Sequence, residues 1–207
     1  MKLHLSQVLY FAVFLLSLTA MKASAKFIAV NDGKADSIII IAPDASEDLK
    51  NTAKYFQTIL EEISGAAIPI KSEKSQDKPI QLIEDLALEN EEFSIQIDQK
   101  SITISGGGRF GVLYGINELL YRLGMYWPLP DPLWREVPKL KTVEFEAVSL
   151  HSKPYFQIRA IHHHPPATES NAFFNWMSFN RSNYRLQNPP GNYNLSAMNK
   201  RGVKPFF

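Results

Sequence analysis

The sequence contains no cysteine. This absence excludes a disulfide framework, a thiolate metal site and a cysteine nucleophile. The chain also has almost no excess charge, because 22 Lys and Arg side chains are balanced by 21 Asp and Glu side chains. A nucleic-acid partner is therefore not expected, since such proteins concentrate basic residues on one face. An apolar fraction of 45% still allows a stable core without disulfides.

The sequence also lacks an apolar run long enough to span a bilayer. Its N-terminal run, Val8 to Leu18, is short against the roughly 20 residues that a transmembrane helix needs. Lys2 and His4 precede this run, and the small residues Ala23-Ser24-Ala25 follow it. This order predicts a secretory signal peptide over residues 1–25, cleaved after Ala25. We therefore expect an exported protein, periplasmic or extracellular, with no membrane span after cleavage.

The most informative stretch is residues 93–127. Alternating isoleucines at 95 and 97 and at 102 and 104 flank a polar turn, which predicts a β-hairpin with one buried face. A glycine run follows, and then an amphipathic helix that begins near Arg109 and ends at Gly124. The apolar positions of this helix recur every three or four residues: Val112, Leu113, Ile116, Leu119, Leu120 and Leu123.

The residues before the hairpin predict the rest of an α+β domain. Ser37–Ala42 is a β-branched run that predicts a buried strand. A helix capped by Asp44 or Ser46 follows and ends at Gly65. Two short strands are expected at 67–70 and 80–83, separated by a polar loop at 71–78. Together these elements predict a mixed β-sheet of four or five strands with both helices packed on one face.

The composition changes after Trp127. Pro128, Pro130, Pro132 and Pro138 exclude regular structure there and predict an extended connector. A strand is expected at 142–150, and a second composition begins at Pro154 with a helix candidate over 171–182. The final twenty residues have no apolar period, so we expect an unfinished or disordered end.

The glycine run has the spacing of a dinucleotide-binding loop. Gly106, Gly108 and Gly111 satisfy G-x-G-x-x-G between a strand and a helix. The preceding strand, however, belongs to a tight hairpin instead of a parallel βαβ unit, and an exported protein has little access to nicotinamide cofactors. The favoured interpretation is a sharp strand-to-helix turn, and no cofactor is expected. A nucleotide-binding oxidoreductase remains only a third hypothesis.

Three consecutive histidines, His162 to His164, resemble a metal cluster, but neighbours on a strand point to opposite faces. No metal site is therefore expected. An alternative is a polar strand-end site in which Arg159 and His162 hold a carboxylate or hydroxyl of a ligand. An ordinary exposed strand end remains an equal alternative. Three tryptophans could stack on sugar rings or belong to the core: Trp127, Trp134 and Trp176.

Two stretches resemble a known family: YFQTILEEISGAAIPI at 55–70, and residues 93–140, from FSIQIDQK to EVPKL. The shared motifs are the helix ending in Ser-Gly-Ala, the Ile-Ser-Gly-Gly hairpin exit, the Gly-x-Leu-Tyr-Gly helix and the Leu-Gly-x-x-Trp end. They resemble the non-catalytic N-terminal domain that precedes the catalytic barrel in bacterial α-glucuronidases of glycoside hydrolase family 67 and β-hexosaminidases of family 20. The resemblance covers about residues 37–150.

The resemblance implies a hexosaminidase domain 2-like fold over 26–150, followed at 151–207 by a truncated, partly disordered start of a (β/α)8 barrel. Tyr155–Ile161 would be the first barrel strand, Asn171–Ser182 the first helix and Asn183–Leu186 the second strand. Arg159 matches the place of a substrate-contacting arginine, and the stretch Asn180-Arg181-Ser182-Asn183 resembles a polar motif entering the second strand. The candidate substrate-binding residues are Arg159, His162, Asn180 and Arg181.

The sequence departs from the family where catalysis is concerned. Catalytic carboxylates of such enzymes lie on later barrel strands, and no Asp or Glu follows Glu169 here. Since glycoside hydrolysis needs placed carboxyl groups, this chain alone is predicted to be inactive. We interpret it as the accessory N-terminal domain of an exported glycoside hydrolase, with oligosaccharide or polysaccharide bound by the barrel. The alternative is a stand-alone carbohydrate-binding or interaction module.

Overall fold

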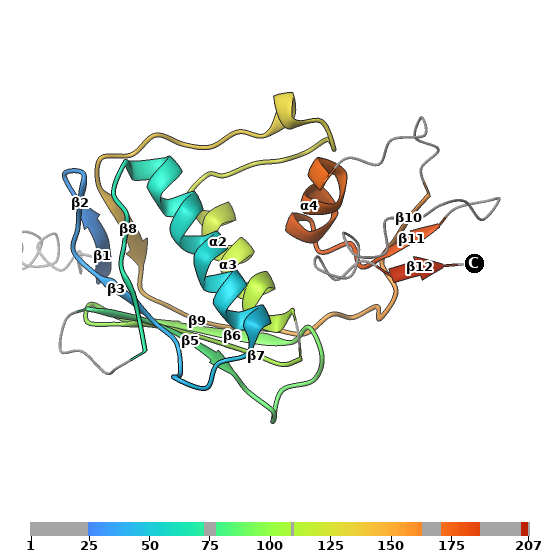
Figure 1. Cartoon of the computed structure of the whole chain (residues 1–207), viewed down its shortest axis with the longest axis horizontal. Helices are drawn as coiled ribbons and strands as arrows, with labels where there is room; N and C mark the ends of the chain where they lie inside the picture. The colour runs from blue at the N-terminus through green and yellow to red at the C-terminus, as the bar shows by residue number, and fades with distance from the viewer. Residues whose placement is uncertain (1–24, 73–77, 109, 163–170, 187–203, 207) are drawn as a thin grey trace, which may run out of the picture.

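The computed structural model describes residues 25–72, 78–108, 110–162, 171–186 and 204–206. Figure 1 shows a helical layer over a broad β-sheet, with a second, smaller unit of α4 and short strands at the C-terminal side. The predicted signal peptide lies outside the described residues, except for Ala25. None of the described helices is long and apolar enough to cross a membrane.

The large sheet has six strands in the order β4-β3-β5-β7-β6-β9. Strands β4, β3, β5 and β7 pair in parallel, whereas β6 is antiparallel to both β7 and β9. The strands are β3 (Ile38–Ile40), β4 (Ile70–Lys71), β5 (Pro79–Glu84), β6 (Phe93–Ile97), β7 (Ile102–Gly106) and β9 (Val148–Ser152). The predicted hairpin is confirmed, with Ile95 opposite Ile104 in its register. The sheet is wider than the expected four or five strands, because β9 adds to its edge beside β6.

Two helices cover one face of this sheet, as predicted (Figure 1). Helix α2 (Glu47–Ser64) begins at Ser46, whose hydroxyl accepts from the Leu49 amide, and ends at Gly65 with φ of 78°. Helix α3 (Gly111–Arg122) ends just before Gly124, which also has positive φ. Their apolar stripes are buried against the strands to form one core.

A second sheet was not foreseen. It has three strands in the order β2-β1-β8, formed by Lys34–Ala35, Lys26–Asn31 and Val143–Glu146. The single strand expected at 142–150 is therefore two strands, β8 and β9, which belong to different sheets. The change of sheet falls at Ala147, whose amide still donates to the Ala25 carbonyl at 2.8 Å in line with the β1–β8 register, before Val148 pairs with Ile97 of β6.

The C-terminal unit follows the expected order of strand, helix and strand. Strand β10 (Ala160–His162), helix α4 (Asn171–Phe179) and strand β11 (Tyr184–Leu186) are shorter than the predicted segments. Strands β10, β11 and β12 (Lys204–Phe206) pair in parallel. Strand β12 lies within the last twenty residues, where no regular structure was expected. The proline-rich connector contains one 3₁₀ turn, η1 (Pro132–Trp134).

The glycine run between β7 and α3 packs directly against another loop. The Gly107 amide donates to the Glu92 carbonyl at 2.8 Å, and the Gly107 carbonyl accepts from the Glu91 amide at 3.1 Å. A Cβ on Gly107 would lie 2.1 Å from the Glu89 carbonyl oxygen. Carbonyl oxygens therefore occupy the space in front of this turn, which favours the structural interpretation of the glycines.

Candidate functional site

The contact between the α+β domain and the C-terminal unit is built around Glu91. This carboxylate lies in the loop before β6, and its side chain is only 5% exposed. Arg159 donates to it at 2.5 Å, and the Asn183 amide group donates to both of its oxygens at 3.2 Å. Glu91 thus joins the residue that precedes β10 to the residue that precedes β11. A buried carboxylate needs such partners, because burial without them is very costly.

The remaining groups of Arg159 also bond to protein atoms. Its Nε donates to the Arg181 carbonyl and its Nη1 to the Phe156 carbonyl, both at 2.7 Å. The Arg159 amide donates to the Asn183 side-chain oxygen at 2.8 Å. Every guanidinium nitrogen of Arg159 therefore has a partner within the contact. The expected contact between Arg159 and a substrate stays a prediction.

Arg181 forms the second part of the contact. Its guanidinium bonds to Glu118 of α3 and lies over the Phe93 ring, with the Arg181 Cζ atom 5.1 Å from the ring centroid. Arg181 itself adopts φ of 56°. Glu118 also accepts from Arg122 at 2.8 Å. This single carboxylate thereby accepts from two guanidinium groups, one from each part of the chain.

The other two predicted site residues lie apart from this cluster. Asn180 donates to the Trp127 and Trp176 carbonyls, each at 3.0 Å, so its amide bridges α4 and the end of the helical layer. The backbone of His162 pairs with Leu186 in the β10–β11 ladder. The side chain of His162, and all of His163 and His164, lie outside what the structure describes.

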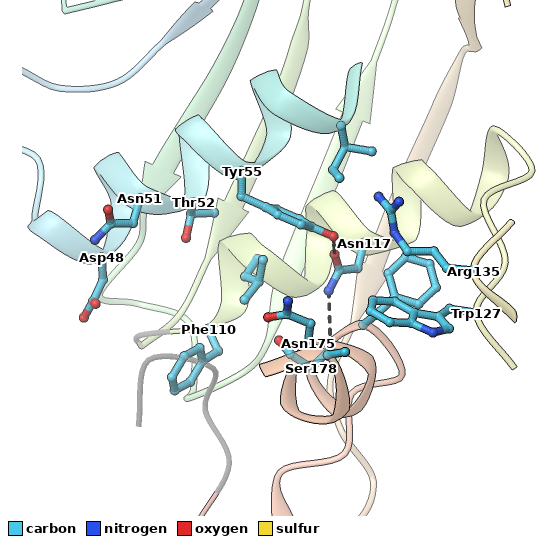
Figure 2. Close-up of a pocket in the computed structure, with 14 residues that line it drawn as sticks. Asp48, Asn51, Thr52, Tyr55, Phe110, Asn117, Trp127, Arg135, Asn175 and Ser178 are labelled. Carbon is cyan, nitrogen blue, oxygen red and sulfur yellow. Dashed lines mark hydrogen bonds between the residues drawn. The ribbon is translucent and has the colours of Figure 1, made fainter. Parts of the chain in front are cut away.

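A groove of about 590 Å³ lies between α2, α3 and α4. Figure 2 shows Tyr55 of α2 reaching toward Asn117 of α3, above Asn175 and Ser178 of α4. The Tyr55 hydroxyl donates to the Asn117 oxygen at 3.1 Å, and the Asn117 amide group donates to the Ser178 carbonyl at 3.3 Å. This chain of hydrogen bonds links all three helices across the groove.

Charges at the groove and the contact are matched by partners. Arg135, at one end of the groove, makes two parallel bonds to Glu62 at 2.9 and 2.8 Å. These bonds hold the pKa of the Glu62 carboxyl below its usual range. Burial raises the pKa of Tyr55 and of Tyr114 above the usual range, and the nearby Glu91 carboxylate adds to the effect at Tyr114. Both phenols are neutral at physiological pH and act as polar but uncharged groups.

Ionisable side chains are few in the described lining of the groove. Among the described residues that line the groove, Asp48 is the one carboxylate, whereas most glycosidases use a pair. Within the described ranges there is also no group of three or more His, Asp or Glu side chains that could hold a metal ion. Sequence reasoning included Asn183 in the polar motif before the second strand but missed Glu91 and Glu118, because their partners lie 63 to 92 residues away along the chain.

A mixed sheet with two helices on one face, continuing into a parallel strand–helix–strand unit, defines the class as two-layer α+β domains. Residues 23–125 match the sequence model of glycosyl hydrolase family 20, domain 2, so this region of the chain is similar to that domain. A search of curated proteins found no match to the chain.

Solved structures with a similar fold include two hexosaminidases and a glucuronidase. The β-hexosaminidase of Streptomyces plicatus is 12% identical, covering 88% of this chain and 42% of its own, with a TM-score of 0.64. The β-N-acetylhexosaminidase of Bacteroides fragilis is 14% identical, covering 88% of this chain and 41% of its own, with a TM-score of 0.56. A family 115 4-O-methyl-α-glucuronidase, BtGH115A, is 15% identical, covering 86% and 29%, with a TM-score of 0.61. The chain therefore spans less than half of each of these structures.

Proposed function

We propose that this chain is the N-terminal accessory part of an exported glycoside hydrolase that acts in carbohydrate degradation. Its α+β domain supports the start of a (β/α)8 barrel and carries no catalytic carboxylates itself. The observation that carries the proposal is the buried contact of Glu91 with Arg159 and Asn183. Through this contact the domain fixes the residues entering two adjacent parallel strands, β10 and β11.

Two further observations support this role. The domain 2 match covers residues 23–125, and the similar structures named above belong to glycoside hydrolases. Strands β10 and β11 with α4 between them form the repeating unit from which a (β/α)8 barrel is built. Three short parallel strands cannot close a barrel, so the catalytic centre would need further polypeptide. Export rests on the N-terminal sequence pattern alone.

The test is a reconstitution of hydrolysis. The 207-residue chain is assayed alone and joined to the polypeptide encoded downstream of Phe207, using 4-nitrophenyl N-acetyl-β-glucosaminide and 4-nitrophenyl α-glucuronide. We expect release of nitrophenol only from the joined protein. Turnover by the 207-residue chain alone would overturn the assignment of an accessory role. Equal activity after deletion of residues 26–150 from the joined protein would also contradict it.

A stand-alone carbohydrate-binding module is the alternative function. The groove between α2, α3 and α4 is the observation that favours this function.

A further inference from the structure

The groove between α2, α3 and α4 has a largely apolar lining into which several uncharged polar groups are set. Each of the three helices contributes one amide side chain: Asn51 from α2, Asn117 from α3 and Asn175 from α4 (Figure 2). An amide group offers both a donor and an acceptor, and so does every hydroxyl of a sugar. A volume of about 590 Å³ lies within the range of small-molecule sites.

The hydrogen bonds across the groove hold its polar groups in place without using all their capacity. Tyr55 donates to Asn117, and its oxygen can still accept. Asn117 uses one N–H on the Ser178 carbonyl and keeps a second. These groups are pre-organised, which lowers the entropy cost of binding a flexible polyol.

One hydroxyl in the groove lining is unsatisfied among the described residues. Ser178 is only 5% exposed, and its Oγ atom has no hydrogen-bond partner within the part of the chain that the structure describes. A buried hydroxyl without a partner costs about 1–3 kcal/mol. This oxygen atom is itself buried, so it lies beneath the surface that a ligand in the groove would contact.

The apolar and charged parts of the lining restrict the ligand further. Phe110 and Leu113, both half-buried, provide apolar surface for the C–H faces of a sugar ring, whereas Trp127 is buried in the core. Arg135 is the one cation among the described lining residues, and both oxygens of Glu62 engage it, so it is not available to a uronic acid. The lining therefore matches a neutral ligand.

We propose that this groove binds a neutral oligosaccharide, one or two sugar rings at a time. The ring faces pack on the apolar wall, and the three amides bond to the hydroxyl groups. This inference goes beyond the proposed function, because saccharide binding here needs neither a barrel nor hydrolysis. An accessory domain with such a site would hold glycan near the enzyme without cleaving it.

The proposal is tested by titrating the 207-residue chain with N,N′-diacetylchitobiose and with cellobiose. Binding is followed by calorimetry and by tryptophan fluorescence. We expect saturable binding with a Kd on the order of 1 mM, typical of small polar ligands in open sites. Asn51→Ala and Asn175→Ala should each weaken binding about tenfold, the loss expected for one hydrogen bond. Both positions are exposed, so the variants should fold. Asn31→Ala, an exposed asparagine of β1 outside the groove, is the matched control.

A second variant fills the groove without removing a hydrogen-bonding group. Ala172 lines the groove on α4, and Ala172→Trp should abolish saccharide binding while leaving the melting temperature within a few degrees. Absence of binding up to about 20 mM of either disaccharide would overturn the proposal. So would binding that the three groove variants leave unchanged. A change of oligomeric state in Ala172→Trp, without an effect on sugar, would instead identify a protein occupant.

Discussion

Glu91 is a buried carboxylate, although the sequence of its segment predicts an acidic connecting loop. The local sequence Glu89-Asn90-Glu91-Glu92 gives no reason to bury Glu91 and Glu92 and to expose Glu89. Glu91 can be buried because Arg159 and Asn183 donate hydrogen bonds to it, and these two residues lie 68 and 92 residues further along the chain. Arg159 was selected from the sequence by resemblance, but its partner could not be, because no local pattern encodes a contact at this separation.

Replacing Glu91 tests how strongly this contact holds the two parts together. Glu91→Gln keeps the shape but removes the charge that faces Arg159, whose side chain is 23% exposed. We expect a loss of about 2 kcal/mol in the free energy of unfolding, less than for a fully buried pair because water still reaches the guanidinium. Urea denaturation measures the loss.

Glu89→Gln is the matched control for this prediction. Glu89 pairs with Lys153, but its side chain is 67% exposed, so its replacement should change the stability by less than about 0.5 kcal/mol. Equal effects of the two substitutions would show that burial of Glu91 does not matter.

At the scale of elements, local patterns predicted helix α2, with Ser46 and Gly65 at its ends, and the β6–β7 hairpin, from caps, periodicity and a polar turn. The short β1–β2 hairpin also has a local signal, the Asp32-Gly33 turn, which the sequence reasoning overlooked. The β1–β8 pairing was missed because its partners lie more than 110 residues apart. The change of sheet at Ala147 was missed because β8 and β9 pair with different distant strands, β1 and β6.

The turn between β7 and α3 gives a prediction at this scale. Gly107→Ala places a Cβ 2.1 Å from a backbone oxygen, and backbone cannot move aside as a flexible side chain can. We expect a loss of about 3 kcal/mol or more in the free energy of unfolding. Thermal unfolding followed by circular dichroism measures it.

Gly124→Ala separates this steric effect from a purely conformational one. Gly124 has φ of 93°, and a Cβ there would meet no atom within 4 Å. Its replacement should cost about 1 kcal/mol, from the strain of positive φ alone. A smaller effect at Gly107 than at Gly124 would contradict the close packing of the turn.

For the whole molecule, the described carboxyl groups with shifted pKa values all favour folding above acidic pH. The pKa of Glu62 is lowered by hydrogen bonds from Arg135, that of Glu92 by the Glu89 amide and then by His151, and that of Asp98 by two turn amides. A lowered pKa in the folded state means that the unfolded chain binds protons more readily. These contributions are complete above the unfolded values near pH 4 and are lost as the pH falls through the folded values.

We therefore expect the melting temperature to be nearly constant between about pH 6 and 7 and to fall steeply below about pH 4. Differential scanning calorimetry across this range measures the profile. Glu62→Gln should lower the melting temperature at neutral pH and make the acid decline shallower, because the charged pair with Arg135 is already absent. A mutant profile parallel to that of the original chain would mean that this pair does not contribute to acid sensitivity.

The pairing of β1 with β8 decides where anything attached ahead of Lys26 emerges. Lys26 lies beside Glu146, and Ala25 beside Ala147, at the opposite end of β9 from Ser152, where the chain leaves for β10. In Figure 1 strands β1 and β12 accordingly lie on opposite sides of the molecule. A fusion partner or surface tether joined at Lys26 would therefore be attached on the side opposite the C-terminal strands. The groove and the C-terminal strands would then face away from the attached partner.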